Sequence, residues 1–120
     1  MSCQVRYRDR YVDITHLCLI YVIESANTLC LNAPQTEFIR RCVARWESLV
    51  ASSGNNLLDL DLDRLVTDEV RADEMRRFLA SLRQWVSEHS RVEFPDGRAV
   101  IWVEQILTLF TQYPEGTRSV

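Results

Sequence analysis

The sequence predicts a mainly α-helical fold, a single-domain helical bundle of about four helices spanning residues 1–120. Four stretches repeat apolar residues at the spacing of an amphipathic helix. Hydrophobic residues make up 47% of the 120 residues, and a chain of this length and composition can bury a core without a disulfide or a metal. Only three glycines and three prolines are present, so long flexible connections are not expected.

The N-terminal residues alternate in polarity and predict a short strand or extended arm over residues 1–12. In the stretch QVRYRDRY, Val5 and Tyr7 lie on one side of an extended chain. The arginines on the opposite side are Arg6, Arg8 and Arg10. Because they share one face of a strand, they form a basic cluster that can bind a partner or keep an exposed strand edge in water.

A first helix is predicted to begin at Asp13, whose side chain is suited to an N-cap. Apolar residues then follow at helical spacing as far as Leu29. No charged residue lies between Asp13 and Glu24, so this helix should be central and buried. Its β-branched and aromatic content leaves a strand open as the alternative for residues 17–23.

Two further helices have clear start and stop signals. Pro34 suits the first turn of the second helix, which carries Trp46 in its apolar stripe and ends at Gly54. Thr67 is a candidate cap for the third helix, which runs to about Ser90. Acidic residues follow Thr67 in the first turn, where the helix dipole favours them.

A turn and a last helix complete the predicted fold. In VEFPDGRAV, the Pro-Asp-Gly sequence separates two short apolar segments, and these residues favour a tight turn. We therefore expect a small β-hairpin near 92–101, with a simple helix-to-helix loop as the alternative. A fourth helix carrying Trp102 follows and ends at YPEG, and residues 114–120 form a loose tail.

The stretch LLDLDLDRL is the most unusual in the chain. Its leucines and aspartates alternate, which predicts an extended or turn segment with leucines inward and aspartates in water. The Asp-x-Asp-x-Asp spacing is similar to the start of a calcium loop. Such a loop requires glycine at its sixth position and glutamate at its twelfth. Counted from Asp59, these positions hold Arg64 and Val70, so no metal is expected.

The aspartate row and the N-terminal arginines are the candidate partner-binding residues. Three carboxylates on one face produce a local negative field that suits a protein partner with a basic surface. The alternative is that the two rows pair with each other inside the molecule, which would remove both from the functional surface. The candidate residues are Asp59, Asp61, Asp63, Arg6, Arg8 and Arg10.

The cysteines predict free thiols in a reducing compartment. They are Cys3, Cys18, Cys30 and Cys42. None forms a CxxC pair or zinc-type spacing with a histidine, and the charged N-terminus is unlike a signal peptide. We therefore expect a soluble cytoplasmic protein. A small enzyme using Cys18, His16 and nearby carboxylates is the catalytic alternative, although no phosphate loop or dinucleotide motif is present, and we expect no cofactor.

Composition limits the classes of function that the chain can have. All basic side chains are arginine, and the net charge is −3 with a pI near 5.4, which disfavours general attraction to nucleic acid or an anionic membrane. Small size, acidity and the aspartate row favour a non-catalytic protein-binding module, most of all an inhibitor or an immunity or antitoxin protein that neutralises a bacterial toxin. A dedicated chaperone or adaptor is the alternative within the same class.

Overall fold

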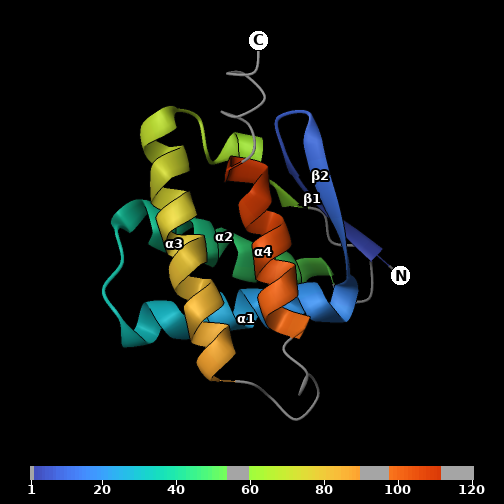
Figure 1. Ribbon diagram of the computed structural model, residues 1–120, viewed down its shortest axis with the longest axis vertical. Helices are drawn as coiled ribbons and strands as arrows, with labels where there is room; N and C mark the ends of the chain where they lie inside the picture. Colours follow the sequence, from blue (N-terminus) through green and yellow to red (C-terminus); the bar gives the residue numbers. More distant parts are fainter. Residues whose placement is uncertain (1, 54–59, 90–97, 112–120) are drawn as a thin grey trace.

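The computed structural model of the chain describes residues 2–53, 60–89 and 98–111, and this part is mainly helical (Figure 1). The predicted fold class is confirmed. The four helices are α1 (His16–Asn32), α2 (Glu37–Ser53), α3 (Glu69–Glu88) and α4 (Arg98–Thr111). In Figure 1, α3 and α4 lie side by side and cross over α1, and a small sheet lies at the α4 side of the bundle.

The N-terminal arm is two strands of a three-stranded sheet. Strands β1 (Ser2–Tyr7) and β2 (Arg10–Thr15) form an antiparallel hairpin. The two-residue strand β3 (Leu60–Asp61) pairs in parallel with β1 on its other side. The strand order is therefore β2-β1-β3. Strands β1 and β2 are neighbours in the sequence, whereas β3 comes from the distant Leu-Asp stretch.

The predicted helix start at Asp13 is wrong. Asp13 lies in β2 opposite Gln4, and the helix begins only after its N-cap residue Thr15. The reason is that the alternation of the arm continues further than the capping signal suggested. Val12 lies opposite Val5, and Ile14 is buried opposite Cys3, so two more apolar side chains reach the core only if the chain stays extended.

The expected common face of the three N-terminal arginines is also wrong. The chain reverses at Arg8 and Asp9, so Arg6 and Arg10 lie on different strands. Arg8 has φ 59°, the one described non-glycine residue with positive φ. Positive φ at only the first of two loop residues is the pattern of a type II′ hairpin turn, a position that usually favours glycine.

Residues 17–23 are helical, so the helix predicted here is confirmed and the alternative of a strand is wrong. Helix α1 buries Leu19, Ile23 and Ala26 and contacts all three other helices and the hairpin. Burial on several sides explains why a sequence with strand-like composition forms a helix here, since tertiary packing outweighs weak intrinsic propensity.

One hydrophobic cluster contains side chains from every described element. The hairpin is attached to the bundle by Tyr7, whose ring stacks on Phe110 of α4 with centroids 4.4 Å apart. Arg83 of α3 donates a hydrogen bond to Glu104 of α4 at 2.7 Å. These contacts hold the sheet and the α3–α4 pair in one packed body, so surface residues of β1 have fixed neighbours.

The remaining predicted boundaries differ in detail. Asp68, not Thr67, caps α3, because its Oδ1 accepts a hydrogen bond from the Arg71 backbone N–H at 2.8 Å. Of the hairpin expected near 92–101, the part up to residue 97 lies outside the described residues. Its remainder, from Arg98, is already the first turn of α4. The tail over residues 114–120 also lies outside them.

Candidate functional site: an arginine-lined cleft

The Leu-Asp stretch is extended for only two residues and then turns. Leu60 and Leu62 are buried, as the alternation predicts, while Asp61 is half-buried and Asp63 exposed. The chain then enters a single 3₁₀ turn, η1 (Leu62–Arg64). Asp61 caps this turn, because its Oδ1 accepts a hydrogen bond from the Asp63 backbone N–H at 3.1 Å. Asp59 and the inward position predicted for Leu58 lie outside the described residues.

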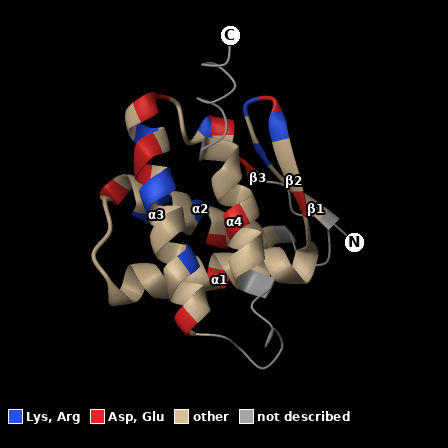
Figure 2. Cartoon of the chain, in the orientation of Figure 1, with Lys and Arg blue, Asp and Glu red and all other residues tan. Residues whose placement is uncertain are grey.

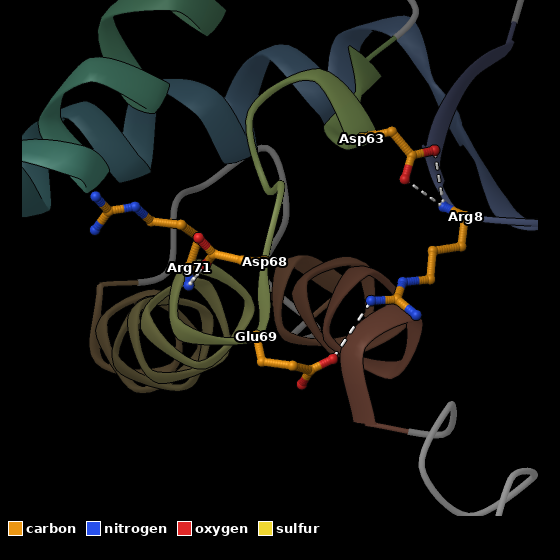
Figure 3. A network of polar contacts seen from close by, with 5 residues as sticks. All are labelled: Arg8, Asp63, Asp68, Glu69 and Arg71. Carbon is orange, nitrogen blue, oxygen red and sulfur yellow. Dashed lines mark hydrogen bonds and ion pairs between the residues drawn. The ribbon is translucent and has the colours of Figure 1, made fainter.

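Asp63 holds the hairpin turn against η1. Both of its carboxylate oxygens accept from the Arg8 backbone N–H, at 3.0 and 2.9 Å, and the Arg8 guanidinium reaches Glu69 Oε1 at 3.4 Å (Figure 3). An internal connection between the aspartate row and the N-terminal arginines therefore exists at Asp63. It runs through the Arg8 backbone, while the Arg8 side chain pairs with the first turn of α3.

Replacing Asp63 by alanine is expected to lower the free energy of unfolding by about 1 to 2 kcal/mol, because a charge-assisted acceptor for a turn N–H is lost. Urea denaturation measures the change. The exposed neighbour Asp9 is the control, and its replacement by alanine should alter stability by less than about 0.5 kcal/mol. Equal stability of the Asp63 variant and the wild type would mean that the carboxylate is free for an external partner.

The other two N-terminal arginines have separate surroundings. The Arg10 guanidinium donates to the Thr108 carbonyl oxygen of α4 at 3.3 Å. Arg6, on β1, lines an open cleft instead. In Figure 2, α1 and α4 carry few charges, and charged residues gather on α3 and around the hairpin turn.

The cleft has a volume of about 520 Å³ and lies where β1, α2, β3 and η1 meet. We call it the arginine cleft. This volume is within the range of ordinary ligand pockets. Its walls combine guanidinium groups with an apolar surface. The lining residues among those described are Arg6, Arg45, Trp46, Leu49, Leu60, Asp61, Arg64 and Leu65.

Among the described residues that line the arginine cleft there is an excess of two positive charges, because three are arginines and one is an aspartate. Arg6, Arg45 and Arg64 are exposed. Within the described part of the chain, none of the three guanidinium groups forms an ion pair or hydrogen bond, whereas Arg8, Arg71, Arg76, Arg77 and Arg83 all do. Neighbouring like charges without internal partners favour an anionic ligand.

Trp46 lines the cleft and has a buried hydrogen-bond donor. It is only 6% exposed, and its indole Nε1 is buried without an acceptor among the described residues. A buried donor without an acceptor is destabilising, and native proteins leave few of them. The indole N–H therefore remains available to an acceptor from outside the described residues.

Sequence reasoning identified only part of this site. Arg6 and Asp61 were candidates, but Arg45 and Arg64 were not. The three arginines lie on β1, α2 and η1, and their proximity depends on the parallel pairing of β1 with β3. The one available signal was Arg45 next to Trp46, at the border between the polar and apolar faces of α2.

The cysteine–histidine contact differs from the expected one. His16 Nδ1 lies 3.6 Å from Cys3 Sγ, which the hairpin brings to the start of α1. Cys18 had been the candidate nucleophile, and Cys3 had not been one. Cys3 is 0% exposed, and neither residue lines any of the four cavities described for this structure. A nucleophile must be reached by its substrate, and burial of Cys3 opposes such access in this conformation.

All four cysteines are free thiols, and thiol labelling tests their surroundings. Burial raises the pKa of Cys42 to about 12 and raises that of Cys30, where Arg40 partly opposes it. In the folded protein at about pH 8, a thiol-reactive dye should leave Cys42 unmodified, since the thiolate is the reactive form, and should leave Cys3 unmodified because its side chain is fully buried. All four should react in denaturant. Rapid labelling of native Cys3 would instead indicate activation by His16.

A second open cavity of about 560 Å³ lies between α1, α2 and the end of α3. It includes Glu24, Glu47 and His89. The His89 ring stacks on Trp85 with ring centroids 3.8 Å apart, and its Nδ1 lies 2.9 Å from the Trp85 carbonyl oxygen at the end of α3. No group of three metal-ligating side chains is found in the described ranges.

Comparison with known proteins adds no relative. No protein-family model matches the chain, and searches of curated proteins and of solved structures return no significant match. Among the described helices, none combines the length and apolar character needed to cross a lipid bilayer.

Proposed function

We propose that this protein is a non-catalytic protein-binding module whose contact surface is centred on the arginine cleft. The observation that supports this most is the set of three guanidinium groups around one cavity that have no ion-pair or hydrogen-bond partner among the described residues, in a chain of net charge −3. An anionic group bound among these like charges would be attracted by all three.

The composition of the cleft suits protein recognition. Arginine and tryptophan are the residue types most enriched at the energetic centres of protein interfaces. Trp46 and Leu60 are buried in the core, so the base of the cleft is held rigidly and little conformational entropy is lost on binding. The long, exposed arginines at its rim can steer association and then form bidentate contacts.

The finer proposal is an inhibitor or immunity-type role, in which the protein neutralises a toxin in the bacterial cytoplasm. Its support is the small size of the chain, its acidic net charge and four free thiols, which persist in a reducing compartment. The basic partner predicted for the aspartate row stays a prediction. Asp61 and Asp63 each accept a hydrogen bond inside the molecule.

A catalytic function is the second candidate, favoured by the contact between Cys3 and His16. The complete burial of Cys3 opposes it. The thiol-labelling measurement separates the two functions, because a catalytic cysteine must react in the folded state.

The protein-binding function is tested by partner capture from native cells with matched baits. The test bait is Arg45→Gln/Arg64→Gln. The control bait is Arg40→Gln/Arg77→Gln, with the same change in net charge at exposed arginines that do not line the cleft. A protein retained by the wild type and the control, but not by the test bait, supports the proposal. A wild-type bait that retains no protein above background contradicts it.

The neutralising role requires one more result. The captured protein, expressed alone in a bacterial host, should stop growth, and co-expression of this chain should restore it. Growth unaffected by the captured protein would leave a binding module without a neutralising role.

A further inference from the structure

The chemistry of the arginine cleft identifies what part of a partner it accepts. Arg45 and Arg64 come from α2 and η1, and Arg6 comes from β1, so the positive charges reach the cavity from separate elements. Arginine presents a planar fork of donors that matches the two oxygens of a carboxylate. A ligand with several carboxylates can therefore engage more than one arginine at once.

The apolar walls restrict the ligand further. Leu49 and Leu65 are half-buried and face the same cavity as the arginines, with Trp46 and Leu60 more deeply buried. A compact inorganic anion would leave this apolar surface in water. An apolar side chain placed between two acidic residues would cover it, at a gain of about 25 cal/mol per Å² buried. Charge and apolar area together favour a peptide segment over a small anion.

We infer that the arginine cleft binds an acidic segment of the partner protein, with carboxylates on Arg6, Arg45 and Arg64 and an apolar side chain against Leu49 and Leu65. This inference rests on the proposed function and specifies its ligand. Asp61, the one carboxylate among the described lining residues, repels an acidic residue placed beside it and so restricts the register of the segment. The charge of this ligand is opposite to that of the partner predicted for the aspartate row.

The test uses fluorescence anisotropy with a labelled peptide of alternating glutamate and leucine. The peptide should bind the wild type and the Arg40→Gln/Arg77→Gln control equally. The Arg45→Gln/Arg64→Gln variant should bind at least about tenfold more weakly, since each charge-assisted contact contributes at least that factor. Binding should weaken with added salt. A peptide with glutamine in place of glutamate should not bind, and melting curves confirm that the variants are folded.

Three outcomes of this experiment would contradict the inference, and each has a different consequence. Equal binding by the wild type and the cleft variant, or no binding by either, would overturn the inference. Displacement of the peptide by millimolar inorganic phosphate would overturn it in favour of a small-anion site. If the peptide fails while partner capture still depends on Arg45 and Arg64, the protein-binding function survives and only the acidic-segment assignment is lost.

Discussion

Replacement of Trp46 by alanine is expected to lower the free energy of unfolding by about 3 to 5 kcal/mol, the usual effect of truncating a large aromatic residue in a core. Trp46 is 6% exposed and belongs to the main hydrophobic cluster. It also lines a small apolar cavity beside Leu19 and Met75, so truncation would enlarge an existing void. Equilibrium denaturation in urea measures the loss.

The Trp46→Phe variant separates the two roles of this residue. It keeps most of the ring volume but removes the indole N–H, so it should retain most of the stability. A Trp46→Ala variant as stable as the wild type would contradict the core assignment and make the side chain an interface anchor alone.

Replacement of Leu62 by alanine is expected to cost about 2 to 5 kcal/mol, the range for large-to-small changes at buried leucines. Leu62 is 1% exposed, although aspartates flank it on both sides. The matched control is Leu17→Ala, because Leu17 is 65% exposed on α1 and should lose less than about 0.5 kcal/mol. Similar losses at both positions, measured by thermal denaturation, would contradict the inward orientation of the Leu-Asp stretch.

The helical part of the fold was predictable because its signals are local. Helix α2 has a stripe of apolar residues at helical spacing, and it ends at Ser53, next to the predicted Gly54. The predicted start is wrong, because α2 begins at Glu37 and Pro34 precedes it instead of lying in its first turn. The sheet was less predictable. Asp13 gave a capping signal within a continuing alternation, and only pairing with β1 shows which signal prevails. The parallel contact of Val5 with Leu60 joins segments far apart in sequence, and no local pattern specifies it.

In the candidate site too, features set by local pattern were predictable and features set by distant residues were not. Alternation correctly placed Leu60 and Leu62 inward. The interaction partner of each charged side chain was not predictable, since it depends on residues that are distant in the sequence. Asp63 accepts from the Arg8 backbone N–H, whereas Arg45 and Arg64 line one cleft without an ion-pair partner among the described residues. The sequence therefore predicted a site built on a row of carboxylates. In the structure, the candidate site contains arginines that lie far apart in the sequence.

The most direct measurement of the central claim, that the arginine cleft binds carboxylates, is an ¹H–¹⁵N NMR titration with the glutamate–leucine peptide. The indole N–H signals belong to Trp46, Trp85 and Trp102 and can be assigned with single phenylalanine variants. Trp46 lines the arginine cleft, while Trp85 lines the second cavity. The Trp46 signal should shift on addition of the peptide while the Trp85 signal stays unchanged. A shift of Trp85 with no change at Trp46 would contradict the account.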